Sequence, residues 1–226
     1  MRVARLAVAL FASACSQARP PHAGAPEPVN TVEAEISPDR AADSLLVDVR
    51  TLEPGIVVEL RYATANNFTG APLPGYSANR AYLRREAAAA LVRVQGNLRP
   101  QGLGLKVFDA YRPVRATNAM VDWTNRANRA DLIRDGYIAG RSRHNLGVAI
   151  DLTLIQLQGG RELDMGTPFD TFSSAAHTAN ASGQVAVNRQ KLKAAMEREG
   201  FSNYEQEWWH FSFSVPAPLR FDKPIR

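Results

Sequence analysis

The sequence predicts an α+β fold with a largely antiparallel central sheet flanked by helices. Segments with the period of a helix and segments with the alternation of a strand are mixed along the chain, and they do not follow the strict strand–helix–strand order of a parallel sheet. The composition, 45% hydrophobic and 22% charged, is that of an ordinary globular protein. The 226 residues are enough for one medium-sized domain with appendages.

Residues 1–15 are expected to be a secretory leader. Arg2 and Arg5 precede an apolar run that is shorter than the ~20 residues of a membrane-spanning helix. Small residues at 12–14 are followed by Cys15, the single cysteine, in an arrangement that resembles a bacterial lipobox. We therefore expect an exported bacterial protein, either periplasmic or anchored to the outer face of a membrane through lipidated Cys15. The alternative is ordinary cleavage nearby, with Cys15 lost or left as a free thiol. A lone cysteine also implies folding without disulfides.

Residues 16–45 are rich in proline and alanine and show no periodicity, which predicts a flexible linker. His22 lies in this linker and is not expected to belong to a site. The folded domain is then expected at residues 46–226.

The first elements of that domain follow from local patterns. Residues 55–64 are rich in β-branched side chains and predict a strand. Residues 82–98 predict a helix, because apolar residues recur at helical spacing on one face and a glycine lies near the end. Residues 105–110 predict a second strand. Pro113 then begins a helix that is expected to continue through Trp123.

The later elements are predicted in the same way. Residues 147–157 form a strand candidate, and residues 188–200 form a helix candidate with Asn188 as its N-cap and Gly200 at its end. Residues 208–213 predict the final strand.

Two of these strands each present one polar residue that could bind a metal. Because alternate residues of a strand face opposite sides, Asp151 points away from the apolar row of its strand, toward solvent or a cleft. His210 points away from the apolar row of the final strand in the same way. The apolar rows are Val148, Ile150, Leu152 and Leu154 in the first strand, and Trp209, Phe211 and Phe213 in the second.

A third candidate ligand, His144, lies directly before the first of these strands. Two histidines and one aspartate make the three-ligand set of a catalytic zinc site, which leaves a fourth position for water. Glu207, three residues before His210, is the candidate base that would take the proton of that water. A regular strand through Glu207 would point its carboxylate into the core, so we expect the strand to start at about Trp209, or to contain a bulge near residue 208.

The segment SRHNLGVAID matches the pattern S-x-H-x-x-G-x-A-x-D, and EWWH matches the second half of the same signature. These motifs resemble the zinc D-Ala-D-Ala metallopeptidases, and most closely the VanX-type D-alanyl-D-alanine dipeptidases. YATANNFTG, DAYRP, AIDLTL, DMGTPFD and EWWHF extend the resemblance, in the same order, from about Val47 to the C-terminus. The resemblance implies the zinc D-Ala-D-Ala peptidase (Hedgehog/DD-peptidase-like) fold for residues 46–226.

The resemblance also implies roles in catalysis. One zinc ion per chain would be bound by His144, Asp151 and His210. Glu207 would act as general base and then as the acid that protonates the leaving amine. Arg112 would stabilise the oxyanion, an interaction typically worth about 3–4 kcal/mol. The alternative for Arg112 is a surface salt bridge worth ~1 kcal/mol or less.

Three further residues would bind the substrate. The resemblance implies that Asp170 and Tyr62 hold the free ammonium of a dipeptide. Ser142, beside the ligand His144, would help to seat the substrate, although a turn hydrogen bond explains it equally well. His177 is expected to be a surface or hydrogen-bonded loop histidine rather than part of the site.

The implied activity is hydrolysis of D-alanyl-D-alanine to two D-alanines, in cell-wall (peptidoglycan) metabolism or dipeptide scavenging. A dipeptidase of this type is usually associated with the cytoplasmic precursor pool, so an export leader favours scavenging in the periplasm. A small dipeptide is the expected partner, and the net charge of +5 without a basic, aromatic-rich run gives no reason to expect nucleic acid.

Three alternatives stay open at this stage. A zinc D,D-carboxypeptidase acting on peptidoglycan stem peptides shares the metal motif, but it would not need the ammonium clamp of Asp170 and Tyr62. A non-haem iron oxygenase also uses two histidines and a carboxylate, usually with histidine and carboxylate two residues apart. A non-enzymatic wall-binding or structural-zinc module would keep the fold without turnover.

Overall fold

The computed structural model describes residues 36–226. The predicted leader and most of the predicted linker therefore lie outside the described residues. The strands are β1 (Ile36–Ser37), β2 (Leu46–Asp48), β3 (Val57–Val58), β4 (Tyr82–Arg84), β5 (Leu103–Asp109), β6 (Ala149–Gln156), β7 (Phe201–Asn203), β8 (His210–Phe213) and β9 (Arg220–Phe221). The α-helices are α1 (Asp39–Leu45), α2 (Val49–Leu52), α3 (Arg85–Leu98), α4 (Val114–Arg126), α5 (Asp131–Arg134) and α6 (Gly183–Arg198). Short 3-10 helices are η1 (Arg61–Ala63), η2 (Arg99–Gln101), η3 (Arg143–Leu146) and η4 (Ser174–Ala176).

A five-stranded sheet with the order β3-β5-β6-β8-β7 forms the centre of the fold. The pairs β5–β6, β6–β8 and β7–β8 are antiparallel, whereas β3 and β5 run parallel. Parallel neighbours need a crossover connection, and here β4 and α3 lie between the two strands in the chain. The α+β class is confirmed, but the sheet is mixed, which corrects the expectation of a largely antiparallel one.

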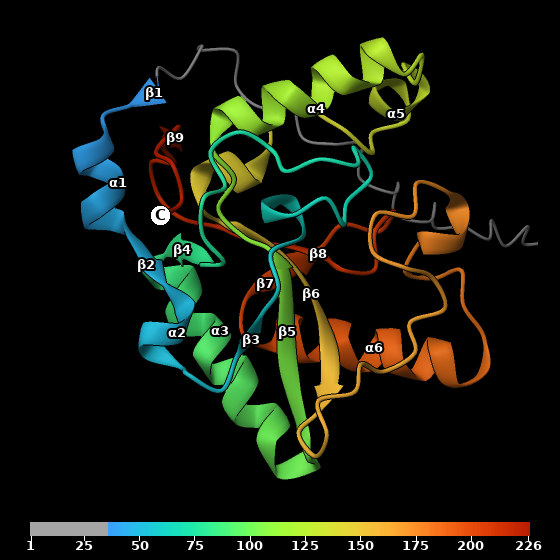
Figure 1. Cartoon of the computed structure of the whole chain (residues 1–226). Coiled ribbons are helices and arrows are strands. Elements are labelled where there is room, and N and C mark those ends of the chain that lie inside the picture. Colours follow the sequence, from blue (N-terminus) through green and yellow to red (C-terminus); the bar gives the residue numbers. More distant parts are fainter. Residues whose placement is uncertain (1–35) are drawn as a thin grey trace, which may run out of the picture. The chain divides into compact units, whose positions relative to one another are not determined.

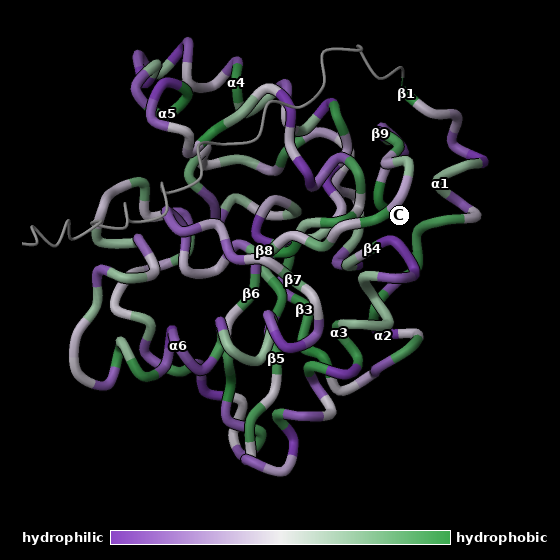
Figure 2. Tube along the Cα trace, turned by 180° about the vertical axis from the view of Figure 1, so that it is seen from behind, coloured by the Kyte–Doolittle hydropathy of each residue, from purple (hydrophilic) through white to green (hydrophobic). Residues whose placement is uncertain are grey.

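Helices α3 and α6 cover one face of this sheet (Figure 1). They contact each other, and α3 packs on β5 while α6 packs on β6. The predicted apolar face of α3 is buried: Ala87, Ala90, Leu91 and Val94 are all 0% exposed. Figure 2 shows hydrophobic residues concentrated along the central strands and hydrophilic residues in the outer loops. None of the helices in residues 36–226 combines the length and apolar character that crossing a membrane requires.

The strand register places side chains as the alternation predicted. Ile150 pairs with Phe211, and Leu152 pairs with Val107. These side chains form the row that faces the helices. Asp151 pairs with His210 on the opposite face. That face is as buried as the first, because every residue from 149 to 155 is buried, so Asp151 lies in a closed cleft rather than toward solvent.

Two predicted boundaries were wrong in the first half of the domain. Only Val57 and Val58 of the predicted strand 55–64 pair with β5, because the side chain of Asn79 bonds to Leu60 N and Val58 O (both 2.8 Å) in place of a neighbouring strand. The predicted helix 82–98 begins with β4, which pairs with β2, and becomes helical at Arg85.

The predicted N-cap of the last helix was also wrong. Helix α6 begins at Gly183 with Ser182 as N-cap, five residues before Asn188. Asn188 is buried inside the helix and donates to Asp164 O (2.8 Å), so its side chain has a tertiary rather than a capping role. The end of the helix at Gly200, with φ of 91°, is as predicted.

The end of the predicted linker is structured. Residues 36–45 form β1, which pairs with β9, and α1, in which Ala42 is 1% exposed. The folded unit therefore begins before the predicted boundary at residue 46. A seven-residue helix with one buried residue was too short a pattern to reveal this from the sequence.

Candidate metal centre and active site

Three side chains that are distant in the sequence converge at the polar face of the sheet. His144 is in η3, Asp151 is in the middle of β6, and His210 is the first residue of β8. The antiparallel pairing of Asp151 with His210 brings two of them together, and Gly147, in a left-handed conformation (φ 66°), turns the chain from η3 toward β6. One ligand atom from each of the three lies within 4.8 Å of the others.

Hydrogen bonding selects the ring atom that His144 presents. Its Nδ1 lies 2.6 Å from Ala110 O and donates to it, so that Nε2 carries the lone pair. His144 Nε2 is 3.2 Å from His210 Nδ1 and 3.4 Å from Asp151 Oδ2. His210 Nδ1 is 2.9 Å from Asp151 Oδ1. The three groups thus direct acceptor atoms at a common point.

This arrangement fits a tetrahedral divalent ion. Bonds of about 2.0–2.1 Å from zinc to nitrogen or oxygen place neighbouring ligand atoms about 3.3 Å apart. The two histidine nitrogens are 3.2 Å apart, and each lies 2.9 or 3.4 Å from one of the two Asp151 carboxylate oxygens. Two nitrogens and one carboxylate are also a donor set that zinc accepts.

The charge states suit metal binding as well. Burial acts to raise the pKa of Asp151, but the two histidines beside it outweigh burial and hold the pKa below its usual range. Burial lowers the pKa of His210, which favours its neutral ring. An ionised carboxylate and a neutral imidazole are the forms that bind a metal.

Glu207 lies beside the three candidate ligands, outside the ladder of β8. The strand begins at His210, and the backbone before it turns, with His210 N donating to Glu207 O (3.1 Å). The expected irregularity before His210 is confirmed. The Glu207 carboxylate is 8% exposed and its Oε2 lies 3.8 Å from His210 Nδ1. Burial, reinforced by Asp151 and Asp170, raises the pKa of Glu207 well above its usual value, which makes it a stronger base.

Arg112 is buried, at 9% exposure, so it is not a surface salt bridge. Its Nε and Nη2 lie 2.9 and 2.8 Å from Asp109 Oδ2, and its Nη2 lies 3.7 Å from Asp151 Oδ2. The guanidinium also stacks over the Tyr62 ring at 5.0 Å. These contacts fix a cation beside the three candidate metal ligands.

Asp109 is a site residue that the sequence reasoning missed. A register shift between Val107 and Asp109 moves Asp109 onto the face of Asp151, away from the helix-facing row. There it accepts from Arg112 and from Tyr76 Oη (2.6 Å), and it lies 3.5 Å from His144 Nδ1. The signal was an acidic residue at the end of an apolar strand, three residues before the predicted catalytic arginine.

Tyr62 and Asp170, the two residues predicted to hold the substrate ammonium, are hydrogen-bonded to each other. Tyr62 Oη lies 3.0 Å from both carboxylate oxygens of Asp170. Asp170 is half-buried, has a positive φ of 61°, and forms no ion pair with any residue of the described range 36–226. Burial, followed by the charge of Asp151, raises its pKa. A carboxylate held in a strained backbone without a cation is typical of a ligand-binding position.

The two remaining candidates have local hydrogen bonds. Ser142 is the N-cap of η3, where its Oγ accepts from His144 N (3.3 Å), so it helps to position His144. His177 Nε2 lies 3.1 Å from Tyr137 Oη in a loop, as expected for a hydrogen-bonded loop histidine.

Comparison with known proteins shows which family this chain is similar to. A family described as D-ala-D-ala dipeptidase matches residues 42–223. A D-alanyl-D-alanine dipeptidase of Enterococcus faecium is 36% identical over 189 residues, which covers 76% of this chain and 94% of the relative. Dipeptidases of the same name from Streptomyces coelicolor (36% identity, 78% and 96% coverage) and Escherichia coli (35%, 79% and 90%) are similarly close.

Proposed function

This chain belongs to the D-Ala-D-Ala dipeptidase family, and from that premise we propose that it hydrolyses D-alanyl-D-alanine to two D-alanines. We propose further that one zinc ion per chain is held by His144 Nε2, His210 Nδ1 and a carboxylate oxygen of Asp151. The observation that supports this function best is the meeting of these three ligand atoms beside a buried carboxylate, Glu207, and a buried cation, Arg112.

When bound, zinc supplies a Lewis acid that polarises the scissile carbonyl and lowers the pKa of water to about 7. Glu207 is placed to take the proton of the attacking water at its Oε2, because its raised pKa gives it affinity for that proton. The same carboxyl then donates the proton to the leaving amine.

Arg112 would stabilise the negative charge that develops on the scissile oxygen. Asp109 and the Tyr62 ring hold its guanidinium in place before substrate binds, so little reorganisation is needed. Asp109 is therefore a positioning residue, which acts through Arg112.

Asp170 and Tyr62 would hold the substrate ammonium. The carboxylate has one hydrogen-bond donor, Tyr62, and no cation among residues 36–226, so a ligand ammonium can supply the missing charge. A site built to pair a free amine disfavours peptides with a blocked N-terminus, because Asp170 would be left unpaired. Ser142 is proposed to help seat the substrate next to His144.

The test compares substrates on the purified, zinc-loaded protein. D-Ala-D-Ala should be hydrolysed, N-acetyl-D-Ala-D-Ala should be cleaved at least 100-fold less efficiently, and a chelator should abolish turnover. Equal or faster cleavage of the acetylated peptide would replace the dipeptidase by a D,D-carboxypeptidase. Absence of turnover on both, with zinc bound, would contradict peptidase activity.

We propose that the protein is exported and recycles dipeptides outside the cytoplasm. The support is the leader pattern of residues 1–15, with Cys15 as the lipidation site. Mass spectrometry of the mature N-terminus should find a lipidated Cys15, and an intact Met1 would contradict export.

A further inference from the structure

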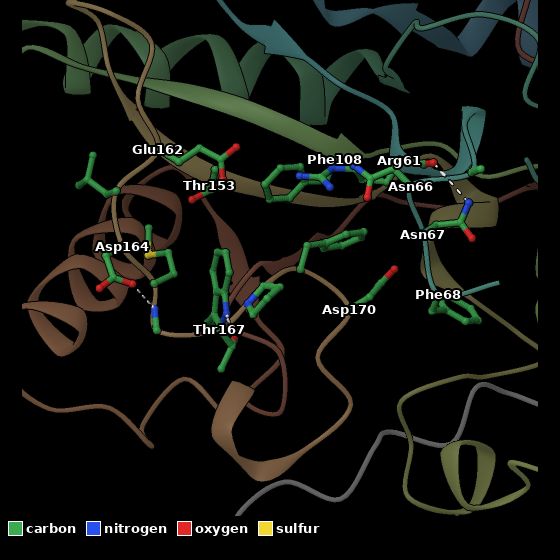
Figure 3. Close-up of a pocket in the computed structure, with 17 residues that line it drawn as sticks. Arg61, Asn66, Asn67, Phe68, Phe108, Thr153, Glu162, Asp164, Thr167 and Asp170 are labelled. Atoms are coloured by element: carbon green, nitrogen blue, oxygen red, sulfur yellow. Dashed lines mark hydrogen bonds between the residues drawn. The ribbon is translucent and has the colours of Figure 1, made fainter. Parts of the chain in front are cut away.

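A cavity of about 700 Å³ lies beside the proposed ammonium clamp. We call it the side-chain cavity, and its lining includes Arg61, Phe108, Thr153, Asp164, Phe169 and Asp170. Figure 3 shows Phe108 and Thr153 of the sheet on one side and Asp164 and Asp170 of the loop after β6 on the other. None of the three metal ligands lines it, so it is a space additional to the metal centre.

The cavity adjoins the site through shared or neighbouring residues. Asp170 belongs to both. Thr153 follows Asp151 by two residues on the same face of β6, a step of about 7 Å along a strand. Trp208, which also lines the cavity, is the residue after Glu207. A group attached to the carbon next to an ammonium held at Asp170 can therefore enter the cavity.

Thr153 supplies a polar group that the fold leaves unused. Its side chain is 0% exposed, and its Oγ1 has no hydrogen-bond partner among residues 36–226. A buried hydroxyl without a partner is unfavourable for folding. Thr153 is among the residues that line the cavity, so a polar ligand atom placed against it would satisfy the hydroxyl.

The cations around the cavity are already paired. Arg61 Nε lies 3.0 Å from Glu59 Oε1, and its guanidinium lies over the Phe108 ring at 4.9 Å. Lys106 Nζ lies 2.8 Å from Glu162 Oε1, and a second carboxylate, that of Glu59, contacts it as well. Both cations therefore have carboxylate partners, although Arg61 Nε has no hydrogen-bond partner among residues 36–226.

Asp164 is in a different position, because its carboxylate retains acceptor capacity. Its Oδ1 accepts from Gly166 N (2.8 Å), and it forms no ion pair with any residue of the described part of the chain. The nearby Arg189 interacts with it electrostatically, but the guanidinium donates its hydrogen bonds to backbone carbonyls, such as that of Met165 (2.8 Å). A ligand ammonium could therefore bind at Asp164.

Between the two carboxylates, Asp170 and Asp164, the wall is aromatic. The half-buried ring of Phe169 lies 6.0 Å from the Tyr62 ring and 5.1 Å from the Phe108 ring. Such a surface suits an alkyl chain rather than a second polar group.

We propose that the side-chain cavity binds the side chain of the N-terminal residue of the substrate, and that it fits an unbranched side chain ending in an ammonium group, as in lysine or ornithine. The proposal rests on the proposed function, because Asp170 must hold the backbone ammonium. The alkyl part contacts Phe169, and the terminal ammonium is bound by Asp164 and by the Thr153 hydroxyl. The substrate class thus extends from D-Ala-D-Ala to basic D-aminoacyl-D-alanine dipeptides.

The test measures kcat/KM for D-Ala-D-Ala, D-Lys-D-Ala, D-norleucyl-D-Ala and D-Glu-D-Ala. D-Lys-D-Ala should be cleaved at least as efficiently as D-Ala-D-Ala and at least tenfold better than D-Glu-D-Ala. Asp164→Asn should lower the value for D-Lys-D-Ala about tenfold and leave those for D-Ala-D-Ala and D-norleucyl-D-Ala unchanged. Cleavage of D-Lys-D-Ala more than 100-fold slower than that of D-Ala-D-Ala would overturn the proposal while the dipeptidase function stands.

A second variant blocks the cavity directly. Ala65 is exposed and lines the cavity, so Ala65→Trp should reduce cleavage of D-Lys-D-Ala and spare D-Ala-D-Ala. Ala89→Trp, on the exposed side of α3, is the matched control and should change neither. If the wild-type protein cleaves none of the dipeptides, calorimetric titration decides: tighter binding of D-Lys-D-Ala than of D-Ala-D-Ala, lost in Asp164→Asn, supports the cavity assignment, and equal or weaker binding overturns it.

Discussion

The two faces of the central sheet are built by the same strands and bury opposite kinds of groups. On the face toward α3 and α6, Ile150, Leu152 and Leu154 are 0% exposed and contact other apolar side chains. On the other face, residues that alternate with these, such as Asp151 and Thr153, are equally buried but polar.

The apolar face stabilises the fold, whereas the polar face forms the candidate site. The apolar face is satisfied by packing within the chain. The polar face contains Glu207 and Asp170, whose pKa values are raised by burial, and a Thr153 hydroxyl without a partner. Such groups are unfavourable for folding until a metal ion, a substrate or a proton completes them. Substitutions on the two faces should therefore have opposite consequences.

The largest effect on the polar face is expected for Glu207→Gln. Loss of the base should lower kcat by about 10²–10⁴-fold, while zinc content and thermal stability stay at or above those of the wild type, because a buried carboxyl with a raised pKa is removed. Turnover and metal content are measured on the same preparation. Wild-type turnover in this variant would contradict the proposed mechanism.

On the apolar face, Leu152→Ala should lower stability and leave activity largely unchanged, the reverse of Glu207→Gln. Leu152 is fully buried, so the cavity left by truncation should lower the free energy of unfolding by about 2–5 kcal/mol. Below the unfolding transition the variant should keep zinc and most of its kcat/KM. Urea denaturation checks the first expectation, and a variant of unchanged stability would show that this face is not the packed core.

Asp109→Asn tests a residue that acts through its neighbours. Without the carboxylate charge, Arg112 loses its ion-pair partner at 2.8 Å, and the Tyr76 hydroxyl keeps only a neutral acceptor. We expect kcat/KM to fall by about 10–100-fold, mostly through kcat, with KM little changed. A change confined to KM would mean that Asp109 contributes to substrate binding rather than to the position of Arg112.

The smallest expected effect is a gain in stability. Because burial raises the folded-state pKa of Asp170, ionisation of the unfolded chain lowers the stability as the pH rises from about 4. Asp170→Asn should therefore raise the Tm of the zinc-free protein at pH 7.5, with the difference shrinking as the pH approaches 4. Asparagine also tolerates the positive φ at this position.

Although Asp170→Asn should raise the Tm, it should lower the activity, because the substrate ammonium loses its charged partner. Hydrolysis of D-Ala-D-Ala should fall mainly through a higher KM. An unchanged KM, or a Tm difference that grows toward acidic pH, would contradict the assignment of this carboxylate.

Much of this site could be predicted from the sequence because strand alternation is a strong signal. The period of two placed Asp151 and His210 opposite their apolar neighbours, and the family motifs pointed to Glu207, Arg112 and Asp170. The position of Asp109 was not predictable in the same way, since it depends on a single register shift.

Element boundaries were the weaker part of the prediction, for local physical reasons. Asn79 ended β3 by replacing ladder hydrogen bonds with side-chain ones, and Asn188 looked like a cap but bonds to Asp164 across the fold. The side-chain cavity could not be predicted from the sequence, because residues from five separate segments enclose it.

The most direct test of this account is the anomalous diffraction of a zinc-loaded crystal at the zinc absorption edge. We expect one peak per chain, about 2.0–2.2 Å from His144 Nε2, His210 Nδ1 and a carboxylate oxygen of Asp151, with Glu207 beside it and not bound to it. A peak elsewhere, or zinc bound without these three side chains, would contradict the proposal that the polar face of the sheet is a metallopeptidase site.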